Sequence, residues 1–208
     1  QLLIIGDENV KGFIGLIKNN IHFNIDINSQ WKRKLSFEEA VKQCDNLSKR
    51  FTKGDYVVIL WSSKNALRGR IDAKRVEALS RTCSKTNLIL IGPPMHYNRP
   101  ILNRIIHEQN IIIFKTLSDV NSNSYFVPLL FETSNGFLKY SDRSSIAEHI
   151  CARLRRKCDT EVIVNGNSTS SNTENMRDPS AAESQSESNL VAVKPNLIFL
   201  RSLKTANM

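Results

Sequence analysis

Three polar clusters along the chain have the residue types and the placement to do chemistry. Asp7-Glu8-Asn9, Ser62-Ser63-Lys64-Asn65 and the loop Pro93–Arg99 each follow an apolar segment typical of a buried strand. The carboxyl ends of parallel strands meet at one edge of a sheet, and ligands of such sheets bind there. The three clusters therefore predict a shared crevice.

Ester hydrolysis is one chemistry that this crevice could support. A serine attacks an ester when a neighbouring base takes its proton. Ser62 and Ser63 are the candidate nucleophiles, but no partner base is evident for them in the sequence; His96 is the one histidine placed beside the expected crevice. We expect at most a weak residual esterase. The histidines and cysteines lack metal-ligand spacing, so we expect no metal and no cofactor.

Positive charge points to a second kind of function. The chain carries 29 Lys and Arg against 20 Asp and Glu. Residues 1–158 contain all of the excess, whereas residues 159–208 are slightly acidic. A strongly basic domain favours a polyanionic partner such as RNA or DNA, the alternative being a charge that only promotes solubility.

The residues best placed to contact a nucleic acid lie on loops and helix starts near the carboxyl edge of the predicted sheet. Trp31 is an aromatic side chain that could stack on a base. The predicted contacts are Trp31, Lys32, Arg33, Lys34, Lys64, Arg68, Arg70, Lys74, Arg75, Arg99 and Arg104. A further cluster, Arg153–Lys157, falls at the expected end of the last helix, where the helix dipole explains cations without any ligand.

Apolar periodicity alternates between strand and helix types along residues 1–158. We predict strands at Leu2–Ile5, Ile21–Ile27, Asp55–Trp61, Leu88–Ile91 and Tyr125–Leu130. We predict helices near residues 9–20, 36–51, 71–83, 99–114 and 142–157. Ser36 and Glu39 have the spacing of a capping box at the start of the second helix. This alternation predicts an α/β fold, a three-layer sandwich whose central sheet is mostly parallel.

The last fifty residues differ from this pattern. Residues 159–208 are predicted to form a largely disordered, low-complexity tail, because Asn165–Ser188 is rich in Asn, Ser, Thr and Glu and has no apolar periodicity. The segment Leu190–Leu203 is more apolar and is a candidate for binding a protein partner. It is too short to span a membrane, and no other segment is long and apolar enough.

The four cysteines are scattered, and Cys44 and Cys151 fall on apolar helix faces. Such cysteines are more often buried thiols than metal ligands. Their number and spacing favour a reducing, intracellular compartment, and we expect the cytoplasm rather than the nucleus.

Several segments resemble the signature blocks of SGNH-type (GDSL-like) hydrolases. The run Leu2–Asn9 (LLIIGDEN) resembles the first block, an apolar strand leading into Gly-Asp-Ser, and Glu8 stands at the position of the nucleophilic serine. The run Asp55–Leu67 (DYVVILWSSKNAL) resembles the third block, with Ser62 at the family's glycine and Lys64 at its oxyanion asparagine.

The last block is anchored on Ile146–Leu154, which resembles the helix after the family's Asp-x-x-His. Counting back places Ser134 at the aspartate and Phe137 at the histidine. A rival alignment pairs Asp142 with His149, which we reject because they are seven residues apart on one helix. The resemblance implies an SGNH/flavodoxin-like fold that has lost its catalytic residues, so we expect no enzyme.

The most specific stretch is Gly92–Ile106 (GPPMHYNRPILNRII). It resembles a proline-rich pattern of SGNH-like domains in insect retroelement-derived proteins. The OSK domain of Oskar, an RNA-binding SGNH-like domain without the triad, is a related case. The resemblance implies an inactive domain that binds RNA or another nucleic acid. The alternatives are a protein-interaction scaffold and a weak residual esterase.

Overall fold

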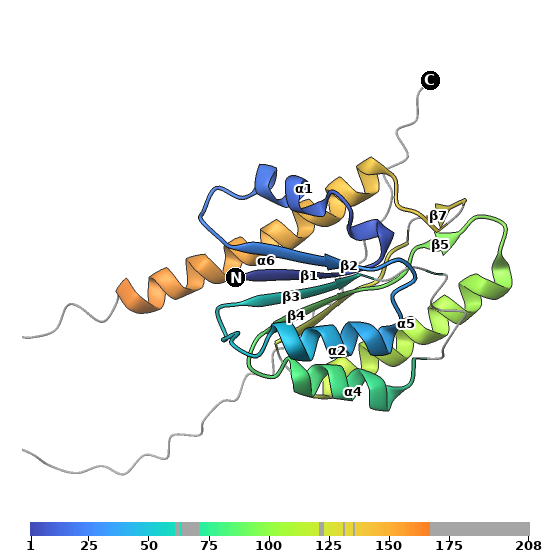
Figure 1. Ribbon diagram of the computed structural model, residues 1–208, viewed down its shortest axis with the longest axis horizontal. Helices are drawn as coiled ribbons and strands as arrows, with labels where there is room; N and C mark the ends of the chain where they lie inside the picture. The colour runs from blue at the N-terminus through green and yellow to red at the C-terminus, as the bar shows by residue number, and fades with distance from the viewer. Residues whose placement is uncertain (61–62, 64–70, 121–122, 131, 135, 167–208) are drawn as a thin grey trace, which may run out of the picture.

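The computed structural model describes residues 1–60, 63, 71–120, 123–130, 132–134 and 136–166 (Figure 1). The strands are β1 (Leu2–Gly6), β2 (Ile27–Trp31), β3 (Tyr56–Leu60), β4 (Asn87–Ile91), β5 (Met95–His96), β6 (Ser124–Val127) and β7 (Glu132–Thr133). The helices are the short 3₁₀ helix η1 (Glu8–Val10), α1 (Phe13–Asn20), α2 (Phe37–Leu47), α4 (Ala73–Thr82), α5 (Pro100–Val120) and α6 (Tyr140–Gly166).

The central sheet is parallel and has the strand order β2-β1-β3-β4-β6. Every residue of β1, β3 and β4 is buried. Parallel strands covered on both faces read as continuous apolar runs, which explains why these three strands were the plainest in the sequence. A separate pair, β5 and β7, lies beyond the carboxyl ends of β4 and β6.

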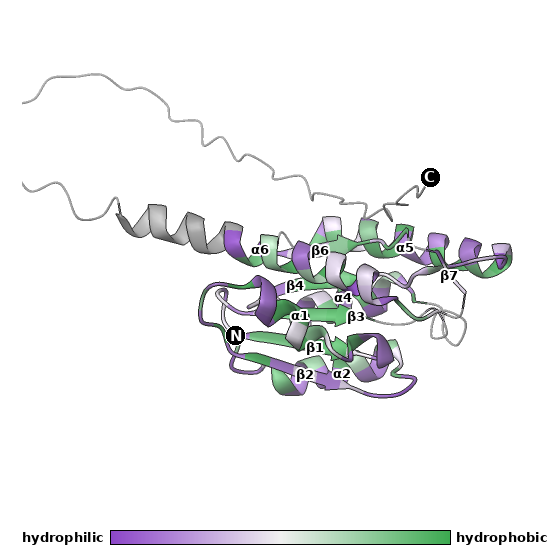
Figure 2. Ribbon diagram, turned by 90° about the horizontal axis from the view of Figure 1, so that it is seen from above, coloured by the Kyte–Doolittle hydropathy of each residue, from purple (hydrophilic) through white to green (hydrophobic). Residues whose placement is uncertain are grey.

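Alternate residues of each strand point into two different cores, as the pleat requires. Leu2 and Ile4 of β1 pack with α1 and α6, whereas Leu3 and Ile5 pack with α2 and α4. Figure 1 shows α1 and α6 on one face of the sheet and α2, α4 and α5 on the other, and Figure 2 shows that the central strands are largely hydrophobic. The predicted three-layer α/β/α sandwich is confirmed.

The structure corrects the predicted second strand. Ile21–Ile27 alternates as a strand would, and its apolar side chains do pack against the core. Hydrogen-bonded pairing with β1 nevertheless begins only at Ile27, opposite Leu2, and continues to Trp31 opposite Gly6. The strand is thus the polar stretch INSQW at the edge of the sheet, which apolar periodicity could not reveal.

Four predicted helices have different bounds. The second, α2, ends at Leu47, before the predicted end at residue 51. The first is divided into η1 and α1 by Gly12, whose φ of +82° is not helical. α5 continues to Val120, past the predicted end at residue 114, and α6 continues to Gly166, past residue 157. The cluster Arg153–Lys157 therefore lies inside a helix and not at its end.

Most of the predicted tail, residues 167–208 with Leu190–Leu203, lies outside the described residues. Among the residues that the structure describes, no helix has the length and apolar character needed to cross a membrane.

Candidate active-site crevice

The parallel sheet brings the three predicted polar clusters to one edge. Asp7 is buried and accepts a hydrogen bond from the backbone N–H of Asn9, which caps η1. The amide of Asn9 is also buried; it donates to the carbonyl of Gly136 (3.3 Å) and accepts from the N–H of Leu138 (2.9 Å). The cluster after β1 therefore holds the segment between β7 and α6 in place.

Ser63 and His96 meet at the centre of this crevice. The Ser63 hydroxyl Oγ makes a hydrogen bond with Nε2 of His96. Ser63 has no exposed surface, and His96 is only 5% exposed. The backbone of His96 is held on both sides by Asn103, which accepts from its N–H (2.7 Å) and donates to its carbonyl (2.8 Å). The expectation that Ser63 lacks a partner base is wrong, because β5 delivers His96 to it.

Gly136 covers this Ser63–His96 pair. It has a φ of +81°, and a methyl group added to it would lie 2.6 Å from Oγ of Ser63 and 3.0 Å from Nε2 of His96. Thr133 holds the backbone at Gly136 in place, because its hydroxyl accepts from the N–H of Gly136 (3.0 Å) and donates to the carbonyl of Met95 (3.2 Å). The pair is therefore enclosed by backbone that is itself hydrogen-bonded.

What the Ser63–His96 pair can do chemically depends on whether a substrate can reach the Ser63 hydroxyl. A serine and a histidine in contact are the first two parts of an acyl-transfer site. Attack also requires a carbonyl carbon about 3 Å from the hydroxyl, with donors beside the developing oxyanion. In this structure, the Ser63 hydroxyl has no exposed surface, and Gly136 lies against it. The Ser63–His96 pair connects Ser63, which follows β3, to β5 at the carboxyl edge.

The residues that the sequence resemblance aligns with the family's catalytic positions are other residues than Ser63 and His96. Glu8 is partly exposed and lies 3.5 Å from the guanidinium of Arg33. Ser134 and Phe137 are exposed, Phe137 at 38%. Ser62 and Lys64 lie outside the described residues.

The rejected Asp142–His149 pairing is separated by seven residues of helix, about 10 Å along its axis. The carboxylate of Asp142 accepts the N–H of Lys139 (3.1 Å) at the start of α6. Its role is thus to stabilise a helix terminus.

Several of the predicted nucleic-acid contacts are neutralised by neighbouring acids. Lys32 lies 2.5 Å from Glu39 in the capping box that starts α2, and this contact, with the N–H of Ser36, lowers the pKa of Glu39 to about 2. The other pairs are Arg33–Glu8 (3.5 Å), Arg75–Glu38 (2.8 Å) and Arg104–Glu108 (3.0 Å). Each pair reduces the positive potential at this edge.

Of the remaining predicted contacts, four are exposed and form no ion pair with a described acid, and three lie outside the described residues. Trp31 is 48% exposed, with the ammonium of Lys11 4.0 Å from its ring centroid. Lys34, Lys74 and Arg99 are exposed and form no ion pair with any acid in the described part of the chain. Lys64, Arg68 and Arg70 are outside the described residues, so their predicted role is untested.

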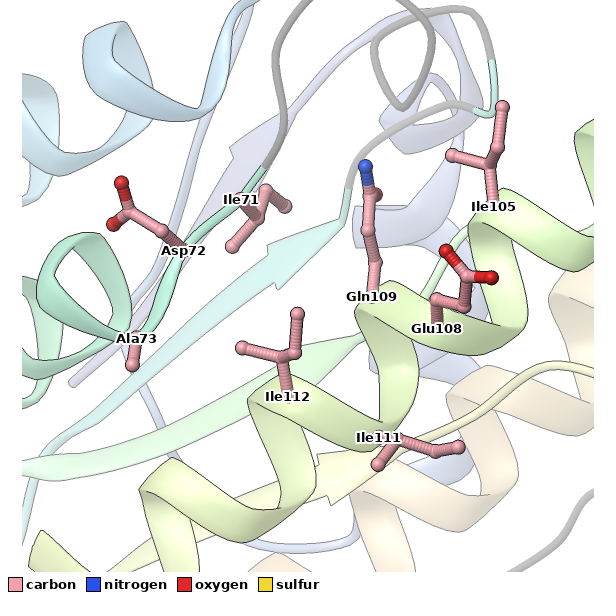
Figure 3. A pocket seen from close by; sticks show the side chains of 8 residues that line it. All are labelled: Ile71, Asp72, Ala73, Ile105, Glu108, Gln109, Ile111 and Ile112. Carbon is pink, nitrogen blue, oxygen red and sulfur yellow. The ribbon is translucent and has the colours of Figure 1, made fainter.

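Two further features lie on the α2, α4 and α5 side of the sheet. Cys44 of α2 and Cys83 after α4 are fully buried, with their sulfurs 3.2 Å apart. A cavity of about 600 Å³ lies between the start of α4 and α5, and half of the residues that line it are isoleucines (Figure 3). None of its lining residues belongs to the Ser63–His96 crevice. No group of three or more metal-ligating side chains occurs among the residues described.

The three cysteines whose side chains the structure describes are all buried. Cys44, Cys83 and Cys151 are buried, which confirms the prediction for Cys44 and Cys151. Burial raises the pKa of Cys151 to about 11, so its thiol stays protonated near neutral pH. The proximity of Cys44 to Cys83 had no signal in the sequence, because 39 residues separate them.

Comparison with known proteins places the fold. No family model matches the sequence, and no curated protein matches it. Among solved structures, TesA superposes with a TM-score of 0.54 at 14% identity, covering 74% of this chain and 96% of TesA. A mutant of Axe2, an acetyl-xylooligosaccharide esterase from Geobacillus, gives 0.53 at 14% identity, covering 74% and 92%.

The C-terminal catalytic domain of peptidoglycan O-acetyltransferase A from Streptococcus pneumoniae gives a TM-score of 0.50 at 12% identity, covering 80% of this chain and 94% of that domain. At these identities the similarity concerns the fold alone. The chain has the SGNH/GDSL hydrolase fold.

Proposed function

We propose that this chain is a catalytically inactive SGNH-like domain that binds RNA or another nucleic acid through a basic surface. The first half rests on the group after β1: the sequence resemblance aligns Glu8 with the family's nucleophilic serine, and in the structure Glu8 lies 3.5 Å from Arg33. A carboxylate at this position cannot attack an ester as serine does, and its charge opposes an oxyanion forming beside it.

The enclosed Ser63–His96 pair supports the same conclusion. A substrate can reach the hydroxyl of Ser63 only if the residues that bury it move, and the backbone at Gly136 is one of them. That backbone is held by hydrogen bonds from Asn9 and to Thr133. Binding energy used to open the crevice is not available to stabilise a transition state.

Charge supports the second half of the proposal. The chain has a formal net charge of +9, and its folded part is more basic than the whole. The segment Gly92–Ile106 also resembles SGNH-like domains of insect retroelement-derived proteins, to which the RNA-binding OSK domain of Oskar is related. Binding through phosphates would be steeply salt-dependent and weakly sequence-specific.

The test is salt-titrated binding of the full chain to a labelled single-stranded RNA and to duplex DNA. We expect affinity to fall about a thousandfold between 50 mM and 200 mM salt if six or more phosphates are contacted. An affinity no higher than that of an unrelated protein of equal net charge would refute nucleic-acid binding. A protein-interaction scaffold would then be the better account.

A weak residual esterase is the second candidate, favoured by the contact between Ser63 and His96. The assay is hydrolysis of p-nitrophenyl acetate, together with labelling by a fluorophosphonate, for the wild-type chain and Ser63→Ala. We expect no labelling of Ser63 and the same low background rate for both proteins. Labelling that Ser63→Ala abolishes would establish the esterase and contradict the inactive domain.

A further inference from the structure

The amino edge of the sheet, opposite the crevice, carries a second group of cations. Two connections meet there: residues 48–55 between α2 and β3, and residues 83–86 between α4 and β4. The side chain of Asn87 donates to the carbonyl of Lys53 (2.6 Å), and the hydroxyl of Thr86 donates to the carbonyl of Asp55 (2.7 Å). These bonds hold the two connections side by side, as Figure 1 shows.

The cations on these connections are Lys49, Arg50, Lys53 and Lys85, and we name them the amino-edge cluster. All four side chains are exposed. Lys49, Arg50 and Lys85 form no ion pair with any acidic residue that the structure describes. The carboxyl edge also has three exposed cations without a described ion pair, Lys34, Lys74 and Arg99, but four other cations there lie beside carboxylates.

Acidic residues near the cluster do little to neutralise it. One carboxylate oxygen of Asp55, Oδ2, accepts hydrogen bonds from the N–H (2.7 Å) and the hydroxyl (2.9 Å) of Thr52, and the other, Oδ1, lies 2.5 Å from the amino group of Gln1. Asp45 is exposed on α2 and pairs with none of the four cations. Like charges held together repel one another, and a bound polyanion removes this repulsion.

α6 extends the basic surface on the same end of the molecule. It runs antiparallel to the strands and continues past the amino edge (Figure 1). The guanidinium of Arg153 lies 3.3 Å from the ring centroid of Tyr125 in β6, and that of Arg155 donates to the carbonyl of Asn20 at the end of α1. Because α6 continues well beyond both arginines, the dipole of its C-terminus does not explain them.

We infer that the amino-edge cluster, and not the carboxyl edge, is the surface that binds the phosphate backbone of a nucleic acid. This inference rests on the proposed function and adds the location of the binding surface. The four members of the cluster are lysines and an arginine, whose charged groups suit phosphates, so we expect its contacts to be to the phosphate backbone. It therefore predicts binding that depends on salt and little on sequence.

A competing explanation needs no ligand. α2 and α4 both end at this edge, and cations near helix C-termini are stabilised by the helix dipole. If the cations of the amino-edge cluster only stabilise these helix ends, neutralising them lowers the stability of the fold. The affinity for RNA then falls no more than it does when an equal charge is removed elsewhere.

The experiment compares two triple variants of the full chain that lose the same charge. One is Lys49→Gln, Arg50→Gln and Lys85→Gln at the amino edge. The other changes the three exposed cations of the rival edge that form no described ion pair: Lys34→Gln, Lys74→Gln and Arg99→Gln. Affinity for a labelled single-stranded RNA is measured by fluorescence anisotropy from 50 to 300 mM salt, and urea denaturation reports the stability of each variant.

We expect the amino-edge variant to lose about tenfold or more in affinity near 100 mM salt. The slope of log K against log salt should become shallower by about 2, since each lost single-strand phosphate contact contributes about 0.7. The carboxyl-edge variant should lose distinctly less, and both should unfold as one cooperative transition.

Three results overturn the inference, and they differ from one another. Equal losses in the two variants, or a larger loss at the carboxyl edge, reject the location while nucleic-acid binding stands. A loss of stability in the amino-edge variant without the larger loss of affinity establishes the helix-dipole explanation. Failure of the wild-type chain to bind rejects the proposed function as well.

Discussion

Replacing Gly136 with alanine tests whether the crevice is enclosed. Gly136 has a φ of +81°, and the new methyl would meet Ser63 Oγ at 2.6 Å and His96 Nε2 at 3.0 Å. An L-residue in the left-handed region costs about 1–2 kcal/mol. Forcing a methyl into packed surroundings costs about 1–3 kcal/mol more. We therefore expect Gly136→Ala to lower the free energy of unfolding by about 2–5 kcal/mol in urea denaturation.

Gly12 provides the matched control. Its φ is +82°, but the nearest atom to an added methyl is a guanidinium nitrogen of Arg143 at 3.9 Å. Gly12→Ala should therefore show the backbone cost alone, about 1–2 kcal/mol. Combining Gly136→Ala with Ser63→Ala removes the closest contact, so the double variant should recover part of the packing cost relative to the sum of the single changes.

The outcome that refutes the enclosure is equality of the two glycine variants within about 0.5 kcal/mol, together with no coupling between Gly136 and Ser63. Gly136 would then not pack on the Ser63–His96 pair. A substrate could then reach the hydroxyl of Ser63 without moving Gly136, and burial of Ser63 would no longer favour an inactive site.

Two further predictions concern α2. The pKa of Glu39 is lowered to about 2 in the fold, so its carboxylate stabilises the protein fully above its ordinary pKa of 4.5 and loses this effect as pH falls toward 2. Because solvent screens this exposed group, Glu39→Gln should cost only roughly 1 kcal/mol at pH 7, about the value of a helix cap, and almost nothing at pH 2. Denaturation curves with equal losses at both pH values would contradict this. Oxidation with diamide should join Cys44 and Cys83, whose sulfurs lie 3.2 Å apart, and raise the stability by about 4 kcal/mol for a loop of this length. Mass spectrometry that finds both thiols still reduced after prolonged oxidation would show that they are not neighbours in solution.

Much of the fold was predictable because it depends on local signals. Both hydrogen bonds of the predicted capping box are present. The hydroxyl of Ser36 accepts from the N–H of Glu39 (3.2 Å), and the carboxylate of Glu39 accepts from the N–H of Ser36 (3.0 Å). β1, β3 and β4 are continuous apolar runs, as buried parallel strands are. These signals need no knowledge of the tertiary structure.

The crevice was only partly predictable, since its details depend on contacts between distant parts of the chain. The sequence places Ser63 and His96 after neighbouring strands, but their contact depends on a two-residue strand, β5, paired with β7. The ion pairs Arg75–Glu38 and Arg33–Glu8 likewise join residues on separate elements. Counting cations along a sequence cannot show which of them a neighbouring acid neutralises.

The enclosed crevice and the changed residues have a common physical explanation. An active esterase must keep a reactive hydroxyl exposed and leave oxyanion donors without partners in the resting state, which costs stability. In this chain, the amide of Asn9 bonds the backbone on both sides of Phe137, and the hydroxyl of Ser63 bonds His96. If the proposed function is right, no nucleophile follows β1, and closing this edge of the sheet stabilises the fold without loss of catalysis. Nucleic-acid binding would then depend on other surfaces, so the location of the cations that have no acidic partner among the described residues is the informative observation.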